Sequence, residues 1–280
     1  MLKVTVPPAE PRDSLRQLLQ NRTLDCAIDE STAKIQRQPA SASLRWLLFQ
    51  LLCLKGDWLR ALKQLQVWAS LNTKHLRMAQ MLRELLRAEA YRSEVMKGAK
   101  EPGWLDAPAS WSRQLTQAIH AMESGDPARA DMLRREALDA APEAAGHANP
   151  GSGFGWITDS DSRLGPNCEL LFSGGYRWLP FSQIARLSFP PVQDALDLIW
   201  RQCKVTLHDQ TELSAYMPTR YPLTHDETDA QKLAAITTWS DRSETTVAGA
   251  GQRTWLTDAG ELPMLSILSM HFEGQAIECA

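Results

Sequence analysis

A six-residue pattern, Gly-Asp-x-x-Arg-Ala, occurs twice in the first half of the chain and constrains the fold more than any other feature. The copies begin at Gly56 and Gly125, which lie 69 positions apart. That spacing is close to two periods of the tetratricopeptide repeat, a pair of helices of about 34 residues. The glycine is suited to end one helix, and the aspartate is suited to cap the next. The pattern therefore predicts stacked pairs of helices.

Apolar residues at helical spacing complete four such pairs in the first half of the chain. Pro39, Pro102 and Pro142 lie where the second helices of three pairs are expected to end. The predicted pairs are 12–21 with 23–37, 43–54 with 57–71, 75–88 with 91–99, and 111–124 with 127–140. We therefore predict a tetratricopeptide-like helical-repeat domain over residues 1–143.

Residues 144–152 are rich in glycine and turn-forming residues, which predicts a linker. After it the apolar pattern changes to short runs of β-forming residues separated by turns, and Ser173-Gly174-Gly175 has the composition of a hairpin turn. Strands are predicted at 154–158, 168–172, 176–181, 184–189, 204–207, 214–217, 252–256 and 265–272, and helices at 192–200 and 229–237. The predicted fold class is α+β, with a mixed α/β C-terminal domain over residues 153–280.

Composition limits the classes of partner. The net charge is −3, so no overall field attracts nucleic acid or an anionic membrane. The five cysteines are odd in number and form no CxxC pair, which favours reduced thiols over a secreted disulfide framework. The N-terminus does not have the pattern of a signal peptide, and no apolar run approaches the roughly 20 residues that span a bilayer. We expect a cytoplasmic protein that binds neither nucleic acid nor membrane and needs no cofactor.

The most distinctive segment places Asp159, Asp161 and Arg163 in a turn after a predicted strand. Paired carboxylates could ligate a cation or act as acid and base. However, the loop lacks the further oxygen ligands of an EF-hand. The preferred interpretation is structural, with the aspartates accepting hydrogen bonds from turn amides and pairing with Arg163.

Arg220 lies between two prolines, in a loop where it could hold a carboxylate or phosphate. Internal pairing with Asp159 or Asp161 is the preferred alternative. Gly249-Ala250-Gly251 does not have the sequence of a phosphate-binding loop and predicts a bulge or hairpin. Zinc, serine-hydrolase and cysteine–histidine signatures are also missing from the sequence, so we predict a non-catalytic protein without a metal site. The alternative is an enzyme that uses Asp159, Asp161 and Arg220 on an acidic or phosphorylated substrate.

The predicted helix at 43–54 is apolar nearly all round. One stripe serves a core, and a second stripe consists of Trp46, Phe49 and Cys53. This second stripe fits burial between neighbouring helices. It also fits the wall of a groove that accepts a partner's amphipathic helix, and on that interpretation these three residues bind the partner.

Several of these segments together resemble the ImpE family, accessory proteins of bacterial type VI secretion systems. The resemblance is carried by Leu51-Leu52 through Gly56-Asp57-Trp58, Gly155-Trp156-Ile157, Asp159, Asp161-Ser162-Arg163-Leu164-Gly165-Pro166, Tyr176-x-Trp178-x-Pro180-Phe181, Pro218-Thr219-Arg220-Tyr221-Pro222 and Gly251-Gln252-Arg253. It covers nearly the whole chain in order, although the chain departs from it after Ser240. The resemblance implies an accessory protein that binds the N-terminal helical region of the small contractile-sheath subunit and assists the unfoldase ATPase that recycles the sheath. It also implies that Asp159, Asp161, Arg163, Arg220 and Arg253 are family residues, for which we expect a structural role.

Overall fold

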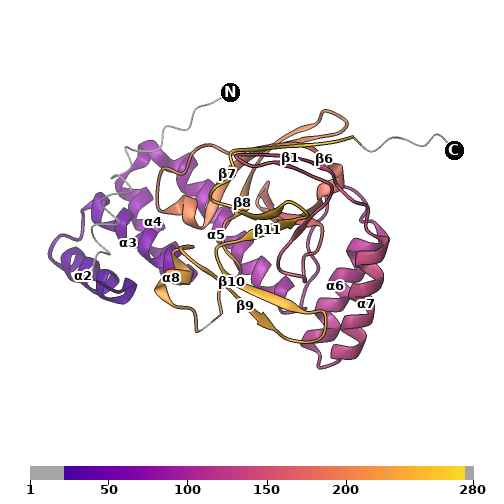
Figure 1. Cartoon of the computed structure of the whole chain (residues 1–280). Helices are drawn as coiled ribbons and strands as arrows, with labels where there is room; N and C mark the ends of the chain where they lie inside the picture. Colours follow the sequence, from indigo (N-terminus) through magenta and orange to yellow (C-terminus); the bar gives the residue numbers. More distant parts are fainter. Residues whose placement is uncertain (1–21, 225, 275–280) are drawn as a thin grey trace.

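The computed structural model describes residues 22–224 and 226–274, where helices come first and strands follow (Figure 1). The helices of the first half are α2 (Leu24–Arg37), α3 (Ala42–Lys55), α4 (Trp58–Leu71), α5 (Leu76–Met96), α6 (Ser110–Glu123) and α7 (Pro127–Ala140), with a 3-10 turn, η1 (Thr73–His75). The predicted α+β fold class is confirmed. The helix predicted at 12–21 lies outside the described residues. Within them, no helix is both long enough and apolar enough to cross a bilayer.

The Gly-Asp pattern has the local role that the sequence predicts. Gly56 ends α3 in the left-handed conformation, at a φ of 83°, and Gly125 follows α6 at a φ of 85°. The carboxylate of Asp57 accepts a hydrogen bond from the N–H of Arg60 at 3.1 Å and caps α4. Asp126 caps α7 in the same way, because its carboxylate accepts a hydrogen bond from the N–H of Arg129 at 3.1 Å. The two motifs therefore make two tight helix–helix connections.

The predicted pair 75–88 and 91–99 is wrong, because both segments belong to one helix, α5. The sequence from Ala88 to Tyr91 contains no glycine or proline that would end a helix. Glu89 and Arg92, on the same helical face, are buried against the strands. The continuous helix is therefore stabilised by contacts far away in sequence. The tetratricopeptide-like repeat stays a prediction.

The described residues of the second half form three antiparallel sheets. The largest has the order β2-β1-β13-β6-β7-β8-β4-β5, a second has the order β12-β11-β3, and β9 pairs with β10. Ser173 and Gly174 both have positive φ in the tight hairpin that joins β4 to β5. The strands are β1 (Gly146–Asn149), β2 (Gly153–Phe154), β3 (Ile157–Asp159), β4 (Asn167–Phe172), β5 (Gly175–Pro180), β6 (Ile184–Ser188), β7 (Trp200–Leu207), β8 (Glu212–Pro218), β9 (Thr237–Asp241), β10 (Val247–Gly251), β11 (Thr254–Thr257), β12 (Gly260–Pro263) and β13 (Ser269–Phe272).

The expected linker, 144–152, contains strand β1, which pairs with β13 and β2. Its alternating buried and exposed residues are those of a strand with one covered face. The segment therefore contains a short strand that lies between β13 and β2. The prediction of a linker is wrong for the residues of β1. The domain boundaries 1–143 and 153–280 stay a prediction.

Two predicted helices are much shorter in the structure. In place of a helix at 192–200 there is a 3-10 turn, η3 (Leu196–Leu198), and β7 begins at Trp200. The carboxylates of Asp194 and Asp197 accept hydrogen bonds from amides of this turn, which replace helical bonds. In place of a helix at 229–237 there is α8 (Asp229–Lys232), which ends before Ala234 at a φ of 50°.

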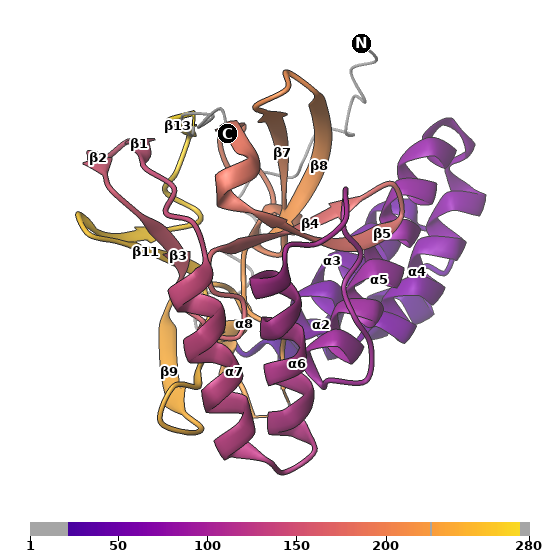
Figure 2. The same ribbon diagram turned by 90° about the vertical axis from the view of Figure 1, so that its right-hand side faces the viewer.

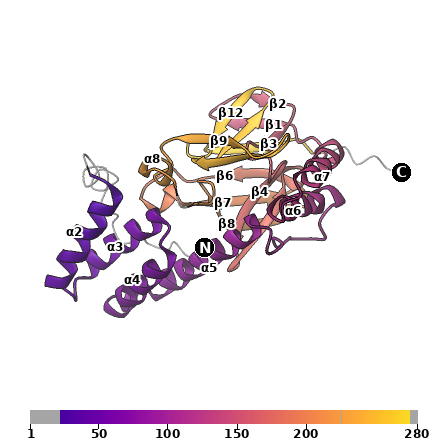
Figure 3. The ribbon, with the colours of Figure 1, turned by 90° about the horizontal axis from the view of Figure 1, so that it is seen from below.

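The large sheet lies between two layers. Figure 3 shows α5 along one face of it and the three-stranded sheet on the opposite side. Side chains alternate accordingly along β4 and β5: Leu171 and Trp178 join the core shared with the helices, whereas Leu170 and Leu179 join the core between the sheets. The helical hairpin of α6 and α7 stands beside these layers (Figure 2). The helices and the large sheet thus share one hydrophobic core.

Candidate functional site

The candidate partner-binding stripe lies on α3, and most of it is buried. Phe49 and Cys53 have exposed fractions of 0%, whereas Trp46 is partly buried. The Trp46 ring packs against Phe49 and Trp68, with centroids 5.2 and 4.8 Å apart. Burial raises the pKa of the Cys53 thiol well above its ordinary value. Of the three residues, only Trp46 can therefore reach a partner in this conformation, and the partner-binding role stays a prediction.

The two aspartates of the distinctive segment are buried at the end of β3. Asp159 pairs with Arg253, whose Nη1 lies 2.6 Å from Oδ2. Asp161 pairs with Arg163 at 2.5 Å and also accepts a hydrogen bond from the N–H of Gly249 at 3.0 Å. Each aspartate accepts a hydrogen bond from the amide two residues further on, at 2.9 and 3.1 Å. These contacts are those that the structural interpretation of the turn expects, and the structural role of the segment stays a prediction.

A second group of charges, from α5 and β4, continues the first. The guanidinium of Arg92 donates two hydrogen bonds to the carboxylate of Glu169, at 2.7 and 2.8 Å, and lies 3.4 Å from Glu89. Glu169 also pairs with Arg253, which thereby links the two groups. We call the whole set the buried charge network; its members are Glu89, Arg92, Asp159, Asp161, Arg163, Glu169 and Arg253.

Arg220 lies beside this network, but it does not pair with either aspartate as we expected. Its guanidinium donates hydrogen bonds to the carbonyl oxygens of Leu54 and Cys53, at 2.6 and 2.8 Å, and to that of Lys232. The first two carbonyls belong to the C-terminal end of α3, where the helix dipole favours a cation. Arg220 therefore connects the β8 loop to α3 and α8, and its role is to satisfy helix ends.

Burial and pairing act in opposite directions on the carboxyl groups. Burial raises the pKa of Asp159 to about 6, although Arg253 favours the charged form. For Asp161, burial is outweighed by Arg163, and the pKa is lowered from its ordinary value. Since the arginines occupy both carboxylates at close range, neither aspartate is positioned as an open ligand or base. Among the described residues, no group of His, Cys, Asp or Glu is arranged to hold a metal ion.

Three members of the network, Glu89, Arg92 and Glu169, were not predicted from the sequence. Glu169 lies in the middle of an apolar strand, and Glu89 and Arg92 lie one helical turn apart on the buried face of α5. The signal that could have identified them is the presence of oppositely charged residues at positions that face the core. Tyr221 completes the site, because its hydroxyl lies 3.1 Å from Oδ1 of Asp159.

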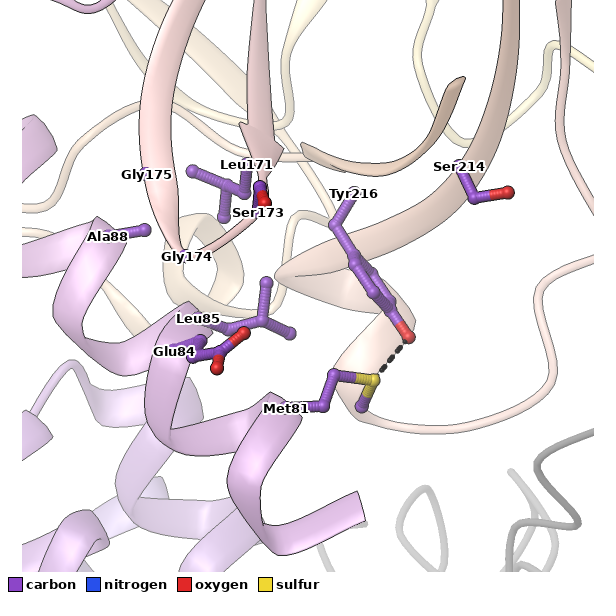
Figure 4. A pocket seen from close by; sticks show the side chains of 10 residues that line it. All are labelled: Met81, Glu84, Leu85, Ala88, Leu171, Ser173, Gly174, Gly175, Ser214 and Tyr216. Carbon is purple, nitrogen blue, oxygen red and sulfur yellow. Dashed lines mark hydrogen bonds between the residues drawn. The ribbon is translucent and has the colours of Figure 1, made fainter. Parts of the chain in front are cut away.

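The surface beside this network is hollowed where α5 crosses the large sheet. Two adjoining hollows, of about 330 and 160 Å³, share Met81, Leu85 and Tyr216 in their walls. Figure 4 shows the smaller one, in which the Tyr216 hydroxyl points to the Met81 sulfur at 2.8 Å. We call the two hollows together the α5 groove. No residue predicted from the sequence as a site residue lines it.

Comparison with known proteins identifies the family to which this chain belongs. The family model for the ImpE protein matches residues 151–271. The type VI secretion system accessory component TagJ of Pseudomonas aeruginosa is 36% identical over 258 residues, which cover 92% of this chain and 90% of that protein. The crystal structure of protein VPA1032 from Vibrio parahaemolyticus is similar at a TM-score of 0.84 and 26% identity, over 94% of this chain and 97% of that one. The chain belongs to the ImpE family.

Proposed function

We propose that the protein is a non-catalytic accessory component of a type VI secretion system that acts in the cytoplasm by binding other proteins. The observation that carries this proposal is the 36% identity to TagJ over nearly the full length of both chains. The similarity includes the helical half as well as the family segment, so the whole architecture is shared. An accessory role therefore fits the complete chain.

The buried charge network supports a role without catalysis. An enzyme that used Asp159, Asp161 and Arg220 would need at least one of these groups free to contact substrate. Instead, Arg253 and Arg163 occupy the two carboxylates, and Arg220 donates to backbone carbonyls. The network is suited to hold α5 against the strands.

We further propose that the partner is the N-terminal helix of the small contractile-sheath subunit, and that binding assists the unfoldase ATPase that recycles the sheath. The partly buried indole of Trp46 on α3 is the contact that we assign to this helix. The Phe49 ring packs against this indole with centroids 5.2 Å apart, and Phe49 and Cys53 are both fully buried. This assignment is supported by the family resemblance and by the aromatic cluster on the helical half.

Calorimetric titration with a synthetic peptide of that sheath-subunit helix tests the proposal. We expect micromolar or tighter binding, and we expect Trp46→Ala to weaken it about tenfold or more, as the loss of an interface tryptophan does. Trp239→Ala is the matched control, because Trp239 is 40% exposed on β9 and lies outside the helical half. Absence of heat with the wild-type protein would refute the proposed partner, and equal losses in both variants would refute the assignment of Trp46.

A further inference from the structure

The α5 groove combines an apolar floor with room for side chains. Met78, Met81, Leu82 and Leu85 repeat at helical spacing along α5, and Trp200 of β7 lies opposite them. The larger hollow, of about 330 Å³, has the volume of a few apolar side chains. Methionine adapts its shape to different partners and is frequent in grooves that bind helices. The groove is therefore suited to the anchor side chains of a docked segment.

Acidic side chains line both hollows of the groove. Asp194 and Asp197 line the larger hollow, and Glu84 lines the smaller one. One oxygen of Asp197 accepts hydrogen bonds from the amides of Gln193 and Asp194, at 2.7 and 3.1 Å, and the other carboxylate oxygen has no such bond. Within residues 22–224 and 226–274, no lysine or arginine forms an ion pair with these three acids.

The cation closest in sequence to Asp194 and Asp197 already donates hydrogen bonds to the backbone. Arg201 also lines the larger hollow, but it is buried and donates hydrogen bonds to the carbonyl oxygens of Pro190 and Met264, at 2.8 Å each. Burial and the neighbouring Asp197 raise the pKa of Asp194, so an added cation would stabilise its charged form. Arg201 interacts electrostatically with Asp197, so the two hollows are lined by three acids and one arginine and keep a net negative charge beside apolar surface.

We propose that the α5 groove is a docking site for an amphipathic helix of a partner protein that carries a lysine or arginine within its apolar face. The apolar side chains enter the space between α5 and β8, and the cation pairs with Asp194 and Asp197. This proposal does not depend on the sheath subunit, since Trp46 lies on α3 and does not line the groove.

A series of labelled helical peptides tests the docking site by fluorescence anisotropy. The peptides share one leucine-rich apolar face and differ only in its central residue, which is lysine, norleucine or glutamate. We expect the lysine peptide to bind about tenfold tighter than the glutamate peptide, a difference of about 1.4 kcal/mol. The preference should decrease as salt is raised. Equal affinities, or no binding by any peptide, would overturn the proposal.

Two variants locate the binding. Asp194→Asn combined with Asp197→Asn removes both charges while the amide oxygens still accept the bonds that hold the turn. We expect it to abolish the preference for lysine, whereas Asp139→Asn on the exposed face of α7 should leave it unchanged. Met81→Trp, which fills the part of the groove that both hollows share and keeps both aspartates, should weaken all peptides. Unchanged binding in both groove variants, or sedimentation showing that a second copy of the chain occupies the groove, would overturn the proposal.

Discussion

Replacing Arg92 with methionine tests whether the buried charge network joins the helices to the strands. Arg92 projects from α5, has a side chain that is 1% exposed, and donates two hydrogen bonds to Glu169 of β4. A third bond reaches the carbonyl of Arg220 at 3.0 Å. Methionine fills part of the same volume but removes the positive charge and these three hydrogen bonds. The substitution should therefore destabilise the whole protein.

The size of the effect follows from burial. Removal of one partner from a buried ion pair typically costs about 3–5 kcal/mol. Glu169 keeps its contacts with Arg253 and the Tyr176 hydroxyl, and Glu89 keeps a hydrogen bond from Trp200 at 2.9 Å. Because these contacts compensate part of the lost charge, we expect Arg92→Met to lower the free energy of unfolding by about 3 kcal/mol.

Lys204→Met provides the matched control. Lys204 pairs with Glu212 at 2.6 Å, nearly the same distance as between Arg92 and Glu169, but its side chain is 44% exposed and that of Glu212 is 58% exposed. Such a pair contributes about 0–1 kcal/mol. Urea unfolding followed by circular dichroism and tryptophan fluorescence measures both variants. A loss for Arg92→Met no larger than that for Lys204→Met would refute the reasoning.

Two further predictions concern residues around the same network. Gly249→Ala would place a Cβ 2.4 Å from the ring of Tyr221 and should lower the free energy of unfolding in urea by about 1–3 kcal/mol. Gly153→Ala is the control and should be tolerated, because the nearest atom to its Cβ would be 3.6 Å away. Equal losses of stability in the two variants would contradict this prediction. The pKa of Asp159 is raised from 3.8 to about 6, so between these pH values the folded state holds a proton that the unfolded chain releases. The contribution of Asp159 to stability should therefore be greatest below about pH 4 and fall by about 3 kcal/mol as the pH rises through about 6. Asp159→Asn should remove this part of the pH dependence of the free energy of unfolding, and an unchanged slope would contradict the assignment.

Local features of the fold were predictable from the sequence, because their causes lie within a few residues. The caps at Asp57 and Asp126, the hairpin at Ser173-Gly174 and the paired turn of Asp161 with Arg163 follow from the chemistry of single residues. Each satisfies backbone groups of its own segment. The periodicity of apolar residues likewise predicted most of the helices of the first half.

Features that depend on distant contacts were not predictable in the same way. The continuity of α5 is stabilised by Glu169, which lies 77 residues after Arg92. The end of α3 uses Arg220 from 166 residues further along the chain. The arginine that pairs with Asp159 is Arg253, whereas reasoning from the sequence favoured Arg220 as the internal partner of the aspartates. Which of several charges meet in a core is decided by sheet topology, since side-chain spacing gives only the face on which each residue lies.

The exposure of the proposed partner-binding residues was also not predictable, because it depends on contacts that are distant in sequence. Trp46, Phe49 and Cys53 share one helical stripe, but Phe49 and Cys53 are fully buried, whereas Trp46, which packs against Trp68, is only partly buried. A helix that is apolar on all sides is compatible with both outcomes until its neighbours are known. The α5 groove was not predicted because its walls come from α5, η3, β7 and β8, which meet only in the folded protein.

The central claim, that this protein serves a type VI secretion system by binding the small sheath subunit, is tested most directly by sedimentation velocity. The full-length subunit and a form without its N-terminal helix are each mixed with this protein. We expect a faster-sedimenting complex with the full-length subunit and separate boundaries with the truncated form. Separate boundaries in both mixtures would contradict the claim, and a complex in both would contradict the role given to the N-terminal helix.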